Sequence, residues 1–413
     1  MSALAALYRS ISRHPLYSAL NIGGLALGIA VFLVLSLFVR HEQSFNRFPG
    51  AERLWVMQER YDAPGRPAID SPHVMGGELD LLRHDFPGLV GARWSAIGGT
   101  ILRDGEASTE NLVLIDPAFL PLFDYSVVAG DAARTLTAPD GVVISQRMAR
   151  RYFGERSPIG RPLTLMIGRL TQAFTVGAVV ADAPRSTEFN GSLFVRMTRD
   201  RVEAAAYDHW NVAVGWTFLR FPDADAAHRF EAGLPAFLGR HAFPTGEVKR
   251  AEYRQSLRPL AAIHLFLNGE RETVATLQVV GALTLLIAIV NYVNLATARA
   301  GLRAREVAMR KVLGATRRAL IGQFLGEALA TVALAALIGL ALAELVLPFV
   351  NALGGTELAI DYVGANGIVV PLALLVLVVG LAAGTYPALL LSRFQPAAVL
   401  ASVRAPGGGR AGA

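Results

Sequence analysis

The chain has 413 residues, of which 53% are hydrophobic and only 17% charged, whereas a typical soluble protein is about 25% charged. This length exceeds what one compact domain usually needs, and a mean hydropathy of +0.40 indicates a membrane protein if the apolar residues are clustered. The net charge of +6 does not require nucleic acid as a partner, because much of the excess lies beside apolar runs. The absence of cysteine excludes disulfide bonds and cysteine-ligated metals but leaves the compartment open.

Residues 16–39 form the first apolar run, and no charged residue interrupts it. A membrane-spanning helix needs about 20 such residues, so the run predicts a span that follows a short cytoplasmic segment, residues 1–15. The run is longer than the roughly 7–15 apolar residues of a cleaved signal peptide, and no small-residue cleavage site follows it. We therefore expect a retained anchor.

Residues 40–273 are numerous enough to form a hydrophobic core of their own and predict a folded α+β domain. Short apolar or alternating runs predict strands at residues 54–58, 112–115, 142–144, 174–180 and 216–221. Helical patterns cover residues 77–84, 146–153 and 224–234, and the second of these has Ser145 as its expected N-cap and Gly154 as its expected stop. No low-complexity linker divides the domain, so any subdivision would arise by insertion.

Three further apolar runs predict spans at residues 274–295, 319–350 and 367–391. The loop of residues 296–318 is strongly basic, whereas the loop of residues 351–366 contains no lysine or arginine. The positive-inside rule then places both termini, the basic loop and the tail of residues 392–413 in the cytoplasm, and the large domain outside. The predicted fold class is four α-helical transmembrane spans plus an α+β extracytoplasmic domain inserted between spans 1 and 2.

Motifs for catalysis are missing from the sequence. There is no phosphate-binding G-x-x-x-x-G-K-[ST] loop, no H-E-x-x-H zinc motif and no G-x-S-x-G nucleophile elbow. The eight histidines are scattered, and a lone histidine in a polar loop is most often a surface residue. We therefore expect no catalytic, cofactor-binding or metal-binding residues and no enzymatic activity, which favours binding or force transmission.

The basic loop contains a helix-compatible segment, residues 302–313, which ends at Gly314. The segment combines basic residues with an apolar surface that includes Met309, Val312 and Leu313. Two interpretations remain open from the residues alone. The helix either rests on anionic lipid or docks on a cytoplasmic motor protein.

Residues 291–328 resemble the core of the FtsX/MacB-like family of ABC transporter permeases, which has an R-x-R-E-V-x-x-R-K-x-x-G-A pattern followed by Q-F-L-x-E. The second pattern corresponds here to Gln323, Phe324, Leu325 and Glu327. Further segments that resemble the family are HPLYSALNIGGLALGIAVFLVLSLFVRHEQSFNRF, VVISQRMARRYFGERSPIGRPLTL, FTVGAVVADAPRSTEF, LRPLAAIHL and TYPALLLSRFQPAAVL, so the resemblance extends over nearly the whole chain.

This resemblance implies a bacterial inner-membrane permease subunit that works with a separate ABC ATPase. It also implies a MacB-like periplasmic core domain, with residues 141–180 in a β-rich inserted part. ATP hydrolysis by the partner would move the periplasmic domain, for export, efflux or another envelope process. By the same resemblance, the ATPase-coupling residues are Arg303, Arg305, Glu306, Arg310, Lys311, Gly314 and Ala315.

The family pattern also bears on partners. Two permease units would pair, and a periplasmic adaptor is a possible further partner besides membrane lipids. Many relatives carry two copies of the four-span unit, whereas this chain carries one, so a homodimer and a heterodimer both remain open. The alternatives are a lipoprotein-releasing permease and, from another class, a membrane-tethered sensor that signals through the basic loop.

Small and acidic residues within the apolar runs add two expectations. The pairs Gly24/Gly28, Gly322/Gly326 and Gly380/Gly384 have the G-x-x-x-G spacing that allows close helix packing. Glu327 and Glu344 lie towards opposite ends of the third run, where we expect the membrane interface to relieve their charge.

Overall fold

The computed structural model describes residues 12, 15–103, 106–168, 170–184, 186–202, 204–267, 269–298, 307, 309–364 and 367–393. The chain divides into two compact units. The helical unit comprises Met1–Glu42 and Arg271–Ala413, and the sheet unit comprises Gln43–Glu270. Each unit is described below by itself.

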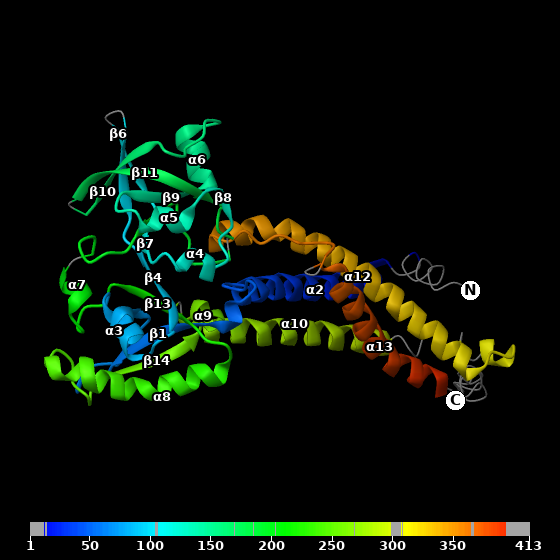
Figure 1. Cartoon of the computed structure of the whole chain (residues 1–413). Helices are drawn as coiled ribbons and strands as arrows, with labels where there is room; N and C mark the ends of the chain where they lie inside the picture. Colours follow the sequence, from blue (N-terminus) through cyan, green and yellow to red (C-terminus); the bar gives the residue numbers. More distant parts are fainter. Residues whose placement is uncertain are drawn as a thin grey trace, which may run out of the picture. The chain divides into compact units, whose positions relative to one another are not determined.

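The described residues of the helical unit form four long helices (Figure 1), which are α2 (Pro15–Gln43), α10 (Glu270–Ala298), α12 (Arg317–Gly354) and α13 (Val369–Arg393). Within the described residues, three helices are long and apolar enough to cross a membrane, namely Pro15–Gln43, Arg271–Ala298 and Arg317–Gly354. The fourth expected span corresponds to α13, whose described apolar stretch, Val369–Ala382, is shorter. The expectation of four spans is thus met for three helices, while a crossing by α13 remains a prediction.

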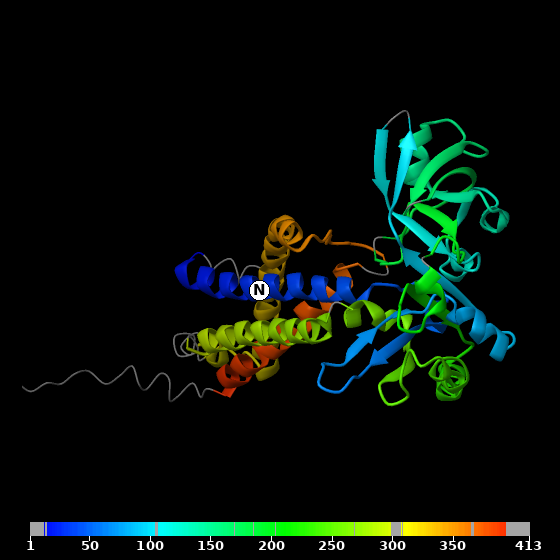
Figure 2. The same cartoon turned by 90° about the vertical axis from the view of Figure 1, so that its left-hand side faces the viewer.

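The core of the helical unit is formed where α2, α10, α12 and α13 meet. Leu25 and Ile29 of α2 are buried together with Val332, Ala335 and Ala336 of α12. Figures 1 and 2 both show α2 and α10 side by side. The outward side chains of these helices are also apolar; Ile287, for example, is 68% exposed. An apolar surface outside an apolar core is typical of helices that contact lipid.

The sheet unit is built on one mixed sheet of 14 strands. Its main path runs β14-β1-β13-β4-β7-β12-β9-β11-β10-β5-β6, with β2, β3 and β8 paired at the side. Most pairs are antiparallel, but β9 pairs parallel with β11 and β7 parallel with β12. The strands are β1 (Leu54–Tyr61), β2 (Ile69–Ser71), β3 (His73–Val74), β4 (Val90–Ala96), β5 (Gly99–Arg103), β6 (Glu106–Glu110), β7 (Leu112–Ile115), β8 (Val127–Gly130), β9 (Gly141–Ser145), β10 (Pro162–Ile167), β11 (Leu170–Val180), β12 (Leu193–Arg196), β13 (Gly215–Arg220) and β14 (Tyr253–Pro259).

Helices cover the sheet along its length (Figure 1), from α8 beside β14 to α6 near β11. They are α3 (Glu78–Asp85), α4 (Phe119–Leu122), α5 (Ala132–Thr137), α6 (Gln146–Phe153), α7 (Ala204–Asp208), α8 (Ala224–His241) and α9 (Ile263–Leu267), with short 3-10 turns at Ala51–Arg53, Phe243–Thr245 and Leu260–Ala262. The expected strands β1, β7, β9, β11 and β13 and the expected helices α3, α6 and α8 are confirmed.

Local capping explains where α6 begins and ends. The Ser145 hydroxyl accepts a hydrogen bond from the Met148 amide at 3.2 Å, as an N-cap does. Gly154 has a φ of +59°, a conformation that glycine adopts most readily, and it ends the helix. The sequence predicted both residues.

The core of the sheet unit follows from the two-residue period of its strands. On β1, Leu54 and Val56 enter an aromatic cluster with Phe119 and Phe218. Trp55 and Met57 point to the other face and enter a second cluster under α3 and α8. A third cluster lies under α6, around residues of β9, β10 and β11. Strands β4, β7 and β12 connect β1 and β13 to β9, β11 and β10. Residues 141–180, which the sequence assigned to an inserted part, therefore share one sheet with the rest of the unit.

Candidate functional site

The basic segment that precedes α12 ends in a tight turn. Residues 309–312 are helical, and Gly314 follows with a φ of +91°. The Gly314 amide donates to the Lys311 carbonyl at 3.0 Å, and the Ala315 amide donates to the Arg310 carbonyl at 2.9 Å. This pair of bonds is a Schellman motif, which requires a left-handed residue where Gly314 stands.

The next helix begins almost at once. Thr316 is the N-cap of α12, and its hydroxyl accepts a hydrogen bond from the Ala319 amide at 3.3 Å. Only residues 313–316 therefore separate the last helical residue of the basic segment from Arg317, where α12 starts. Two capped ends in so short a connection fix the direction of one helix relative to the other.

Side chains also attach the basic segment to α12. Val307 is buried with Leu320 and Phe324 in a small apolar cluster. Beside it, Arg310 Nη1 donates to Gln323 Oε1 at 2.6 Å, and Gln323 Nε2 donates to Glu327 Oε1 at 3.0 Å. Arg310, one of the predicted coupling residues, is thus hydrogen-bonded to Gln323 in the second turn of α12. We call residues 307–327 the coupling corner.

The outer surface of the coupling corner is apolar and basic. Met309, Val312 and Leu313 are 54%, 62% and 80% exposed, and Arg318 is exposed nearby. Among the predicted coupling residues, Lys311 and Ala315 are half-buried and Gly314 is exposed in the turn. Arg303, Arg305 and Glu306 lie outside the described residues. An exposed patch of this composition is typical of a surface that binds another protein or a lipid headgroup region.

Glycines lie at the closest helix contacts of the helical unit. A Cβ on Gly28 would lie 2.4 Å from the Ala288 Cβ of α10, and one on Gly24 would lie 3.7 Å from Asn291 Nδ2. On α13, a Cβ on Gly380 would lie 2.6 Å from Leu329 Cδ2, and one on Gly384 would lie 2.7 Å from the Ala328 Cβ. The structure therefore places these four predicted glycines at contacts within one chain.

One close contact has no G-x-x-x-G signal in the sequence. A Cβ on Gly339 of α12 would lie 2.8 Å from the Ala26 carbonyl oxygen of α2. By contrast, a Cβ on Gly322 would meet nothing within 4 Å. Sequence spacing alone therefore did not distinguish the packed glycines from the open ones.

In the sheet unit, Glu188 contacts two segments that are far apart in sequence. Glu188 Oε2 accepts a hydrogen bond from Asn46 Nδ2 at 2.8 Å, and Glu188 Oε1 contacts His264 Nδ1. With Glu188 ionised, its carboxylate only accepts hydrogen bonds, and His264 then donates through Nδ1. The Phe45 ring stacks on His264 with 3.6 Å between ring centroids. We call Asn46, Glu188 and His264 the Glu188 cluster. No motif signalled it, because its members come from three unconnected segments.

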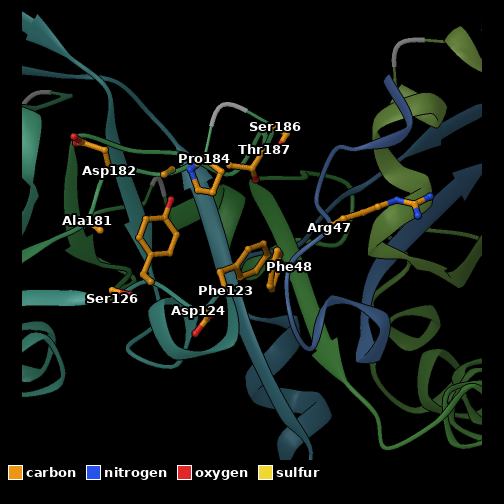
Figure 3. A pocket seen from close by; sticks show the side chains of 12 residues that line it. Arg47, Phe48, Phe123, Asp124, Ser126, Ala181, Asp182, Pro184, Ser186 and Thr187 are labelled. Carbon is orange, nitrogen blue, oxygen red and sulfur yellow. The ribbon is translucent and has the colours of Figure 1, made fainter. Parts of the chain in front are cut away.

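A cavity of about 230 Å³ is lined partly by residues next to the Glu188 cluster in sequence. Phe48, Phe123 and Pro184 line it with apolar surface, and Asp182 and Thr187 add polar groups (Figure 3). In this view the Arg47 side chain points away from the two phenylalanine rings. Asp182 is engaged elsewhere, since it accepts hydrogen bonds from the Arg147 amide at 2.9 Å and from Arg150 Nη2 at 3.3 Å.

Metal-binding geometry is not found in the part of the chain that the structure describes, where no group of three or more His, Cys, Asp or Glu side chains could hold an ion.

Two family models match successive parts of the chain. The model of the MacB-like periplasmic core domain matches residues 18–236, and the model of the FtsX-like permease C-terminal region matches residues 278–396. No curated protein matches the chain.

Solved structures similar to the sheet unit have low identity. A domain assigned to a permease protein from Porphyromonas gingivalis is 20% identical, with a TM-score of 0.44, and the match covers 52% of this chain and 92% of that domain. The periplasmic region of MacB from Actinobacillus actinomycetemcomitans is 12% identical, with a TM-score of 0.35 and coverages of 52% and 92%. The extracellular domain of the noncanonic ABC-type transporter YknZ from Gram-positive bacteria is 14% identical, with a TM-score of 0.34 and coverages of 49% and 99%.

Proposed function

The chain belongs to the family of FtsX/MacB-like permeases, since the core-domain model alone matches more than half of it, and we propose that it couples a separate ATPase to an extracytoplasmic domain. In this role the coupling corner docks on the ATPase in the cytoplasm. The helices relay the resulting movement across the membrane to the sheet unit. Both termini are cytoplasmic, and the relay serves export, efflux or another envelope process.

The observation that carries this proposal is the attachment of an exposed patch to a long apolar helix. Met309, Val312 and Leu313 face outward, while Arg310 is bonded through Gln323 to Glu327 on α12. The Schellman turn at Gly314 leaves little freedom between the two helices. A push on the patch is therefore passed to α12 rather than absorbed by a flexible loop.

The experiment is co-purification of the chain with candidate ABC ATPase subunits expressed together with it. Leu313→Gln combined with Val312→Gln removes apolar surface from the patch. If both side chains are buried on docking, each contributes about 1.5 kcal/mol or more, so we expect affinity to fall at least about tenfold. The matched control is Leu353→Gln at the other end of α12, where Leu353 is 91% exposed.

Charge reversal gives a second arm. Arg310→Glu and Lys311→Glu are expected to weaken ATPase association and to uncouple ATP hydrolysis. Normal association of all these variants would exclude the docking role and favour the lipid-contact interpretation. Association with a kinase in place of an ATPase would support the membrane-tethered sensor.

A further inference from the structure

The Glu188 cluster lies where the chain enters and leaves the sheet unit. Asn46 is three residues beyond the end of α2 at Gln43, and His264 belongs to α9, which precedes the start of α10 at Glu270. Glu188 comes from the connection between β11 and β12. One carboxylate therefore holds the entering segment through Asn46 and the leaving segment through His264.

The entering segment is held by more than this one bond. Asn46 is 1% exposed and has a φ of +56°, which is uncommon outside glycine. Its amide donates to the Ser186 carbonyl at 2.8 Å, and its Oδ1 accepts a hydrogen bond from Thr187 Oγ1 at 2.9 Å. These hydrogen bonds, rather than the backbone conformation, which Asn adopts readily, tie Asn46 to the β11–β12 connection.

The leaving segment is fixed by burial as well as by hydrogen bonding. His264 is 6% exposed, and the Phe45 ring covers it in a parallel stack, with an angle of 5° between the ring planes. Phe45 and Asn46 are consecutive, so the entering segment contacts His264 directly and also through Glu188. The two segments and the β11–β12 connection thus form a single packed unit.

We infer that Glu188 is a positioning residue that makes the entering and leaving segments move together with the sheet. This inference rests on the proposed coupling function, because it names the point at which helix movement becomes domain movement. Two segments tied to the same carboxylate cannot shift independently. A displacement of either one therefore moves the β11–β12 connection and, through β11 and β12, the central strands.

The first test is amide hydrogen exchange of the full-length chain in lipid nanodiscs. Glu188→Ala removes the shared acceptor, and the Asn46 amide, which is bonded to Ser186, reports the result. Since hydrogen bonds to charged groups are the stronger ones in proteins, we expect its exchange to accelerate by about ten- to a hundredfold. The matched control is Asp182→Ala in the same connection, because the described hydrogen bonds of Asp182 go to Arg147 and Arg150 of α6.

Rescue separates positioning from general destabilisation. The chain has no cysteine, so Asn46→Cys with Thr187→Cys introduces the only thiols, at two residues whose side chains are hydrogen-bonded to each other, with 2.9 Å between Thr187 Oγ1 and Asn46 Oδ1. In Glu188→Ala, this disulfide should restore slow exchange at residues 45–47. An unchanged Asn46 exchange rate in Glu188→Ala, or equal acceleration in Asp182→Ala, would overturn the inference.

The second test uses the chain assembled with its ATPase. Glu188→Ala should leave ATPase binding and ATP turnover intact but abolish the ATP-dependent change in exchange at β11 and β12, and the disulfide should restore that change. Persistence of the ATP-dependent change in Glu188→Ala would refute the positioning role. Failure of the unmodified chain to bind an ATPase would refute the coupling function instead, and the exchange comparison on the chain alone would still decide whether Glu188 ties the segments together.

Discussion

Arg93 Nη2 lies 2.8 Å from Asp116 Oδ1, and the two side chains are only 7% and 8% exposed. Arg93 Nε also donates to Asp116 Oδ2 at 2.9 Å, which makes the pair bidentate. A further donor, Arg93 Nη1, reaches the Gly76 carbonyl at 2.6 Å and Asp80 Oδ2 at 3.0 Å. Burial alone would lower the pKa of Arg93, but the bonds to Asp116 raise it, so Arg93 stays charged inside the sheet unit.

Arg93→Ala should therefore destabilise the sheet unit strongly. It leaves the Asp116 carboxylate buried without its partner, which typically costs about 3–5 kcal/mol. Chemical denaturation of the full-length chain, followed by tryptophan fluorescence, measures the change. The control is Arg199→Ala, which removes the exposed partner of Asp208 and should cost less than about 1 kcal/mol. Similar losses in the two variants would contradict this assignment.

Two acidic side chains, Glu78 at the start of α3 and Glu59 on β1, predict a pH dependence. Glu78 is fully buried, and the nearby Gln255 side chain only partly offsets the cost of burying its carboxylate. Burial raises the pKa of Glu78 to about 8 and that of nearby Glu59 to about 7, although Glu59 accepts a hydrogen bond from Tyr253 at 3.1 Å. The folded state is therefore more stable when Glu78 and Glu59 are protonated than when they are ionised.

The sign of the effect follows from these directions. A raised pKa means that the stabilisation is fully present below the ordinary pKa of 4.5 and is lost as the pH rises through 7 and 8. The thermal unfolding midpoint should decrease as the pH is raised from 5 to 8.5. Glu78→Gln should make this decrease smaller. Burial lowers the pKa of His73, so this residue reduces stability as the pH falls below its ordinary pKa of 6.5, the opposite direction to Glu78. His73→Gln therefore serves as the control. A slope unchanged by Glu78→Gln would reject the role of the acid pair.

Gly314→Ala tests the turn of the coupling corner. A Cβ meets nothing within 4 Å there, so the expected cost, about 1 kcal/mol, comes from the φ of +91° alone. We expect weaker stimulation of the ATPase, since the turn sets the direction of the docking helix. Gly322→Ala is the matched control, because this helical glycine also has open space around it. Thermal unfolding and ATPase assays on the same preparations provide the comparison. Equal ATPase stimulation by the two variants would contradict the claim that the turn at Gly314 sets the direction of the docking helix.

Gly339→Ala tests the approach of α12 to α2. The added Cβ would lie 2.8 Å from the Ala26 carbonyl oxygen, and backbone at that distance can move only if the helices separate. We expect a lower melting temperature of the detergent-solubilised chain. Gly23→Ala places its Cβ in open space on α2 and should be neutral or stabilising by up to about 1 kcal/mol. If the two variants melt alike, the helices do not pack as closely as the contact at Ala26 indicates.

The regular apolar elements could be predicted from the sequence because their patterns are local. α6 begins and ends at the residues that Ser145 and Gly154 indicated, and β7 occupies residues 112–115 as expected. Strand β4 was not predicted, because Arg93 and Ser95 are polar and yet buried. Their partners, Asp116 and the Val214 carbonyl, are distant in sequence, so no local pattern accounts for their burial.

The candidate sites divide in the same way. Arg310, Lys311 and Gly314 lie within five residues of each other, so they form a local sequence pattern. Gly314 marks the end of the basic helical segment. The bond from Arg310 to Gln323 was not predicted, because helix periodicity does not cross the turn between them. The Glu188 cluster was missed altogether, since residues 46, 188 and 264 meet only in the folded sheet unit.

The pairing of β1 with β14 determines how the sheet unit resists force. Their ladder runs from Trp55↔Pro259 to Tyr61↔Tyr253, so the chain enters and leaves the sheet at the same end. A pull that separates those two ends would unzip the ladder one pair at a time, whereas a sliding motion would load all its pairs in parallel. The bonds of Asn46 and His264 to Glu188 lie ahead of the first pair. A peeling force must break them before it reaches the strands, which leaves shear as the direction in which the ladder bears load.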